Sequence, residues 1–207
     1  SLRYVRILMP AGDWIAGGMQ GILDAGDPPP AASTEGVLPG LPPEAQQPYR
    51  AFVNYYIHQI NLMRWFLGDP YRPAYADPSG IVLTLESEHG IPGVIEMSPY
   101  RTSVAWEERV LIAFEKGTLR LQLPAPLARG RAGRVSVFRD PGEGTTPERL
   151  QPDLPWVDAM QAQAETFLDV CRGRTAPPCD AAEAFEDLFV AREAVKMILR
   201  AQAGSRA

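Results

Sequence analysis

The sequence predicts an α+β fold, in which an open, mostly antiparallel β-sheet carries helices packed on one face. Short stretches of alternating apolar and polar residues, separated by glycine-containing turns, indicate strands that pair with their neighbours along the chain. Longer stretches with apolar residues at helical spacing lie on both sides of these strands. With 207 residues, 45% of them hydrophobic, the chain is long enough to bury a core as one domain over residues 1–207.

The first element predicted is a strand over residues 2–9, where apolar and polar side chains alternate. Residues 13–46 are rich in glycine, proline, alanine and aspartate, which excludes regular structure along this stretch. Loops of this length are either functional or disordered. Because this one enters the next predicted helix, it is a candidate lid over a cleft.

A helix is predicted around residues 52–67, apolar on nearly every side and therefore expected to be buried. Asn54, His58 and Asn61 are spaced i, i+4 and i+7, which places three polar side chains on one narrow stripe. A buried polar group without a partner costs roughly 1–3 kcal/mol. We therefore expect this stripe to face a cleft bordered by residues 13–46 and by the strand end near Arg101.

Glycine and proline end this helix, since Gly68 suits a helix C-cap and Pro70 prevents its resumption. Within residues 119–123 the leucines face one side, while Arg120 and Gln122 face the other, as in a sheet with one covered face. The further strands are predicted over residues 74–76, 81–88, 93–98, 109–114, 119–123 and 134–139.

Two helices close the chain, the first over residues 157–172 and the second from Asp180 onward. Asp180 with Glu183 three residues later forms a capping-box pattern. The second helix has an apolar stripe that is expected to pack on the sheet. Residues 201–207 are expected to fray.

Composition excludes several classes of function. A net charge of −5 and a pI near 5.1 do not favour nucleic-acid binding. No apolar run reaches the ~18–20 residues that a membrane span requires. Two cysteines and two histidines give neither a disulfide scaffold nor a zinc spacing, so no metal is predicted. Reduced thiols in a cytoplasmic protein are the simplest expectation, with Cys171 buried and inert.

Four segments together resemble a known family of oxidoreductases. Residues 54–70, with His58 and the ending Trp-Phe-Leu-Gly-Asp-Pro, resemble the Asp-x-x-x-His-x-x-Asp helix of the Gfo/Idh/MocA family, although asparagine replaces both aspartates. Residues 106–121 resemble its strand–turn–strand around Glu-Lys-Gly. Residues 167–178 and 180–188 resemble its closing helices. The order and separation of these segments make the resemblance extend over about residues 1–199.

The resemblance implies a dihydrodipicolinate-reductase-like C-terminal domain that binds substrate and mediates oligomerisation. The family's N-terminal Rossmann domain, which binds NAD or NADP, is not found in the sequence. The nearest glycine pattern, Gly142-Glu-Gly144, lacks a third glycine and leads into no helix. The resemblance further implies a sugar, inositol or related polyol as substrate, and a homodimer or homotetramer formed through the sheet face.

His58 is the predicted catalytic residue, because imidazole can both accept and donate a proton near neutral pH. The alternative is a core histidine satisfied by a backbone carbonyl. Asn61, Asn54, Arg101 and Trp14 are the predicted substrate-binding residues. For Asn54 a structural role competes, for Arg101 a solvated strand end, and for Trp14 core packing.

The remaining polar residues are given plain structural interpretations. His89 is taken as a turn residue. The carboxylates of Glu86 and Glu88, and those of Glu107 and Glu108, could imitate a glycosidase pair, but both runs are expected to be solvated. Two functions stay open: a domain of an NAD(P)-dependent oxidoreductase, or a non-catalytic binding or dimerisation module on the same scaffold, which the two asparagine replacements favour.

Overall fold

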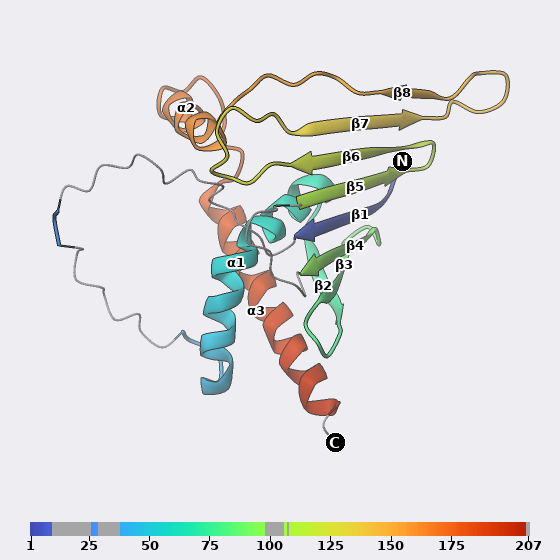
Figure 1. Cartoon of the computed structure of the whole chain (residues 1–207). Helices are drawn as coiled ribbons and strands as arrows, with labels where there is room; N and C mark the ends of the chain where they lie inside the picture. The colour runs from blue at the N-terminus through green and yellow to red at the C-terminus, as the bar shows by residue number, and fades with distance from the viewer. Residues whose placement is uncertain (10–25, 29–37, 98–105, 107, 206–207) are drawn as a thin grey trace.

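The computed structural model describes residues 1–9, 26–28, 38–97, 106 and 108–205 (Figure 1). Its helices are α1 (Pro43–Leu67), α2 (Ala159–Cys171) and α3 (Ala181–Gly204). Its strands are β1 (Leu2–Met9), β2 (Tyr71–Ala76), β3 (Val82–Ser87), β4 (Pro92–Met97), β5 (Glu108–Phe114), β6 (Gly117–Leu123), β7 (Arg134–Arg139) and β8 (Glu148–Leu150).

All of these strands form one sheet in the order β2-β3-β4-β1-β5-β6-β7-β8. The first strand of the chain lies in the middle, parallel to β4 and antiparallel to β5. Every other neighbouring pair is antiparallel. The predicted α+β class with an open, mostly antiparallel sheet is therefore confirmed. The short strand β8 was missed, because three exposed residues carry no alternating pattern.

One face of the sheet forms the core. Figure 1 shows α1 and α3 side by side against this face. The strand register aligns the apolar side chains there, since Ile7 pairs with Ile95 of β4 and with Val110 of β5. These side chains are almost fully buried. In β6 the leucines are more buried than Arg120 and Gln122, as the alternation predicted.

The ends of α1 follow the backbone preferences of its residues. Gly68 adopts a left-handed conformation with φ 64°, and its amide donates to the carbonyl of Arg64, so the predicted C-cap is confirmed. The start differs from the prediction. The helix begins at Pro43, so residues 43–46 are helical. Proline is tolerated in the first turn, where the missing N–H has no helical partner.

The expectation that α1 is buried on nearly every side is wrong. Tyr55 and Trp65 have 61% and 67% of their surfaces exposed. Only one side of the helix lies against the sheet and α3, where Phe52, Ile60 and Met63 are buried. Tyrosine and tryptophan count as apolar when helical periodicity is assessed. The hydroxyl of tyrosine and the indole N–H of tryptophan can nevertheless bond to water, so these side chains can lie at the surface.

Helix α3 begins with the predicted capping box. The Asp180 carboxylate accepts from the amide of Glu183, while the Glu183 carboxylate accepts from the amide of Asp180. The helix continues to Gly204, so the expected fraying from residue 201 is wrong for residues 201–204. Helix α2 has no buried residue, and Cys171 at its end is exposed, which corrects the expected burial of this thiol.

Candidate functional site

Several strands end at the same edge of the sheet, where the chain brings polar side chains together. The register pairs Met9 at the end of β1 with Met97 at the end of β4. Glu108, which begins β5, pairs with Leu123 at the end of β6. Helix α1 passes over this edge, and its Gln59 contacts Glu108.

Glu108 is the unexpected member of this group. Its residue surface is only 7% exposed, so the prediction of a solvated carboxylate is wrong. The side-chain amide of Gln59 donates to its Oε1 at 2.7 Å. Burial raises the pKa of Glu108, while the Gln59 amide, the Trp106 indole and the charge of His58 lower it. Residue 107 lies outside the described residues. Glu108 lies two and four residues before the buried Val110 and Ile112, so the period of the strand was the signal that could have identified it as inward.

The cluster around Glu108 has unfilled hydrogen-bonding capacity. Gln59 Oε1 and Trp106 Nε1 are buried without a hydrogen-bond partner among the described residues. The Trp106 indole is close enough to influence the pKa of Glu108, although its geometry falls short of a hydrogen bond. Buried polar atoms without partners are uncommon in folded proteins. A polar group of a ligand bound at this edge would give these two atoms a hydrogen-bond partner.

His58 lies beside this cluster and is exposed. Its charge lowers the pKa of Glu108, which places the imidazole within electrostatic reach of a buried carboxylate. Asparagine at positions 54 and 61 leaves His58 without a carboxylate on its own stripe of α1. The structure supplies one from a different element, β5. Only the helical spacing was visible in the sequence, and the long-range contact was not.

The predicted stripe of Asn54, His58 and Asn61 divides into two parts. Asn54 and His58 are exposed. Asn61 Nδ2 donates to Asp187 Oδ2 at 2.7 Å and lies 3.2 Å from Cys179 Sγ, both at or near the start of α3. Burial raises the pKa of the Cys179 thiol. Asn61 therefore joins two helices, and its role in substrate binding stays a prediction.

The other predicted site residues cannot be placed. Trp14 and Arg101 lie outside the described residues, as does most of the candidate lid over residues 13–46. Their roles stay predictions. His89, taken as a turn residue, lies in the turn between β3 and β4 and also forms an ion pair. Its Nδ1 lies 2.7 Å from Asp69 Oδ2, and this carboxylate raises the pKa of His89.

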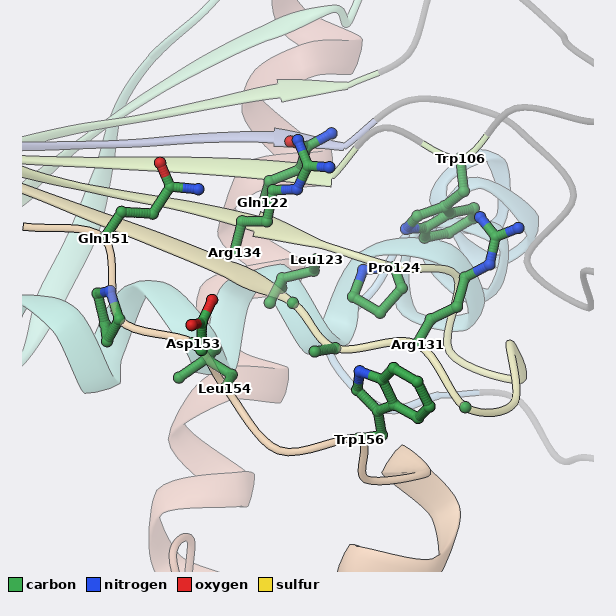
Figure 2. Close-up of a pocket in the computed structure, with 14 residues that line it drawn as sticks. Trp106, Gln122, Leu123, Pro124, Arg131, Arg134, Gln151, Asp153, Leu154 and Trp156 are labelled. Atoms are coloured by element: carbon green, nitrogen blue, oxygen red, sulfur yellow. The ribbon is translucent and has the colours of Figure 1, made fainter.

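A large hollow opens at the same edge of the sheet, next to Trp106 (Figure 2). Its volume is about 860 Å³. The lining comes from the end of β6, the start of β7, the intervening loop and the segment before α2. Its polar and aromatic members are Trp106, Gln122, Arg131, Arg134, Gln151, Asp153 and Trp156. Trp106 thus borders both the hollow and the Glu108 cluster.

The described residues hold neither a cluster of metal-ligating side chains nor a membrane-spanning helix. They contain no group of three histidine, cysteine, aspartate or glutamate side chains arranged to hold a metal ion. Within the same residues, no helix combines the length and apolarity needed to cross a membrane.

Comparison with known proteins gives matches in structure alone. A scan against protein-family models found no match. A search of curated protein sequences also found none. Among solved structures, a candidate NADPH-dependent oxidoreductase from Desulfitobacterium hafniense superimposes with a TM-score of 0.63 at 14% identity. The alignment covers 97% of this chain and 55% of that protein.

Two further structures are enzymes with stated activities. UDP-N-acetylglucosamine 3-dehydrogenase GnnA from Acidithiobacillus ferrooxidans gives a TM-score of 0.61 at 13% identity, covering 97% of this chain and 55% of that one. KijD10, a 3-ketoreductase from Actinomadura kijaniata solved with NADP, gives 0.52 at 11% identity, covering 97% of this chain and 52% of that one. This chain has the fold found in Gfo/Idh/MocA-type oxidoreductases and spans about half the length of these structures.

Proposed function

We propose that this chain is the C-terminal substrate-binding and oligomerisation domain of an NAD(P)-dependent oxidoreductase that acts on a sugar, an inositol or a related polyol. In this proposal His58 is the catalytic acid/base. Asn54, Asn61, Arg101 and Trp14 remain the proposed substrate-binding residues. The fold shared with UDP-N-acetylglucosamine 3-dehydrogenase GnnA and the 3-ketoreductase KijD10 supports the class of reaction.

The observation that carries the proposal is the position of His58. This imidazole is exposed at an edge of the sheet where a buried carboxylate, Glu108, lies within electrostatic reach. Imidazole accepts a proton readily near neutral pH. When a hydroxyl-bearing carbon is oxidised, its hydroxyl group must give up a proton, and His58 could accept it. In the reverse direction His58 would return that proton to the carbonyl oxygen.

The described residues do not offer a site for the pyrophosphate of NAD(P). Such a site needs a glycine-rich turn between a strand and a helix. Gly142 and Gly144 instead lie between β7 and β8, and each helix of the described chain follows a loop without that pattern. We therefore assign the nicotinamide cofactor, which supplies the hydride acceptor when bound, mainly to a further domain.

Exposed apolar side chains on two helices support the presence of such a domain. Phe167 on α2 and Phe185 on α3 are each 66% exposed, and Phe189 on α3 is also exposed. Phe185 and Phe189 lie one helical turn apart on α3, and neighbouring exposed apolar residues often mark an interaction surface. A second domain of the same protein could cover them.

The open face of the sheet supports self-association. The register places Leu111 of β5 between Arg6 of β1 and Arg120 of β6, on the face opposite the helices. Arg6 also lies 3.5 Å from Glu96 on this face. A broad face that mixes apolar and paired charged side chains suits an isologous contact with a second copy.

A non-catalytic binding or dimerisation module is the second candidate function. It is favoured by Asn61, whose amide is engaged with Asp187 and Cys179 rather than left free for substrate. In this case the sheet face would be the functional surface, and His58 would have no chemical role.

Turnover separates these candidates. The full-length protein that contains this chain would be assayed with NAD⁺ and NADP⁺ against inositols, free sugars and nucleotide-linked sugars, following reduced nicotinamide by absorbance. Formation of the reduced cofactor with one substrate class supports the oxidoreductase. Retained binding of a sugar or polyol without turnover in either direction would instead support the module.

A further inference from the structure

The hollow beside Trp106 has a composition that proton transfer at His58 does not explain. Its lining joins two guanidinium groups, two indole rings, two carboxamides and one carboxylate. Figure 2 shows these side chains arranged around one opening, from the strand ends on one side to the segment before α2 on the other.

The guanidinium groups suit a phosphate-bearing ligand. Arg131 and Arg134 are both exposed, and neither guanidinium has a hydrogen bond or an ion pair among the described residues. The loop that carries Arg131 is held in place, because the amide of Gly130 donates to Asp158 Oδ1 at 2.8 Å. Arginine binds phosphate oxygens with charge-assisted hydrogen bonds. Asp153 is the only carboxylate of the lining, so the charge balance stays positive.

The two indole rings suit a planar base or a sugar ring. Trp156 is 81% exposed, which is unusual because tryptophan side chains are highly buried on average. Aromatic side chains stack on nucleobases whatever the base, because every base has a π-face. Gln122 and Gln151 offer both donors and acceptors to a base edge or to hydroxyl groups.

The size of the hollow also indicates more than a simple polyol. Its volume of about 860 Å³ lies in the upper part of the range of roughly 300–1,000 Å³ that is usual for sites of drug-sized ligands. A single sugar ring would leave much of this space, and both arginine residues, without a partner.

We propose that this hollow binds the nucleoside diphosphate part of a nucleotide-linked sugar, with the phosphates on Arg131 and Arg134 and the base against Trp156. The inference rests on the proposed function for its reaction and names the class of substrate. Trp106 connects the two regions, because it borders the hollow and also influences Glu108, which is bonded to Gln59 next to His58. The sugar would therefore extend past Trp106 toward His58.

Isothermal titration of this chain with UDP and TDP tests the site without any turnover. We expect saturable binding of at least one of them. Arg131→Ala combined with Arg134→Ala should weaken it at least tenfold, as should Trp156→Ala. Arg3→Ala combined with Arg72→Ala is the matched control, since it removes the same charge from exposed positions elsewhere on the sheet, and it should leave binding unchanged. Thermal melts would show that each variant is folded.

A His58 variant distinguishes the proposed nucleotide site from the proposed oxidoreductase function. His58→Asn should leave UDP and TDP binding intact, because His58 does not line the hollow. Nucleotide binding in a full-length protein without oxidoreductase activity would support the site and reject the proposed function. The site itself would be refuted by a folded chain that binds neither nucleotide. Equal binding of inorganic phosphate or of a simple sugar phosphate, or unchanged binding in the double arginine variant, would also refute it.

Discussion

Arg64 on α1 and Asp187 on α3 form an ion pair of 2.7 Å between Nε and Oδ1, in a place where both side chains are nearly inaccessible to water. Asn61 donates to the other oxygen of the same carboxylate at 2.7 Å. Two residues one helical turn apart on α1 thus hold one acid on α3. This contact joins the two helices that cover the sheet.

Asp187→Asn should strongly destabilise the fold. The substitution leaves the Arg64 charge buried without its partner, and loss of one member of a buried pair usually costs about 3–5 kcal/mol. Chemical denaturation of the chain measures the free energy of unfolding directly. Arg72→Ala is the control, since it breaks the exposed pair with Glu86 and should cost at most about 1 kcal/mol. A loss below about 1 kcal/mol in Asp187→Asn would show that the contact is not important for stability.

Glu108→Gln should change how stability depends on pH. Burial raises the pKa of Glu108 above its ordinary value of 4.5, so the folded state holds this proton more tightly than the unfolded state does. The resulting stabilisation is complete below pH 4.5 and is lost as the pH rises through the folded-state pKa. Urea denaturation between pH 4 and pH 8 should show a smaller decline in the variant than in the wild type. Parallel curves would contradict a raised pKa.

His58→Asn should affect activity and leave the fold intact. An exposed side chain has water to replace its contacts, so the melting temperature should hardly change. In the full-length protein, kcat should fall by roughly 10²–10⁴-fold, the usual effect of removing an acid/base group. Melts of this chain and kinetics of the full-length protein form the measurement. A large drop in melting temperature would mean that His58 is structural after all.

Leu111→Arg should separate copies of the chain if they associate through the open sheet face. It would place a third positive charge beside Arg6 and Arg120, and also beside the same residues of an isologous partner. Sedimentation velocity at tens of micromolar should show a dimer or tetramer for the wild type and a monomer for the variant. Leu168→Arg, on the exposed surface of α2, is the control. A wild-type monomer at that concentration would argue against the interface.

This chain alone should bind NADPH and NADH only weakly. The described residues lack the glycine-rich turn that holds the pyrophosphate, so most of the binding energy would come from elsewhere. Calorimetric titration of the chain with each cofactor tests this expectation. Micromolar binding of either would mean that the cofactor site lies within this chain.

Local chemistry determined those parts of the fold that the sequence predicted. The alternation of apolar and polar residues predicted both ends of β1 and of β7 correctly. Gly68 predicted the end of α1, and Asp180 with Glu183 predicted the start of α3. Each of these signals acts over a few residues, through backbone conformation or side-chain periodicity. The alternation of residues 119–123 also predicted which face of β6 would be covered.

The tertiary structure alone decided how the candidate site is assembled. Insertion of β1 between β4 and β5 brings the start of β5 under α1, which buries Glu108 against Gln59. The alternation with Val110 and Ile112 gives the face of Glu108 but not this partner. The same packing bonds Asn61 to Asp187, more than a hundred positions along the chain, and leaves His58 exposed. The sequence alone does not show how polar side chains on the same stripe of a helix differ in their surroundings. Their surroundings differ because distant elements pack against one part of a helix and leave another part in water.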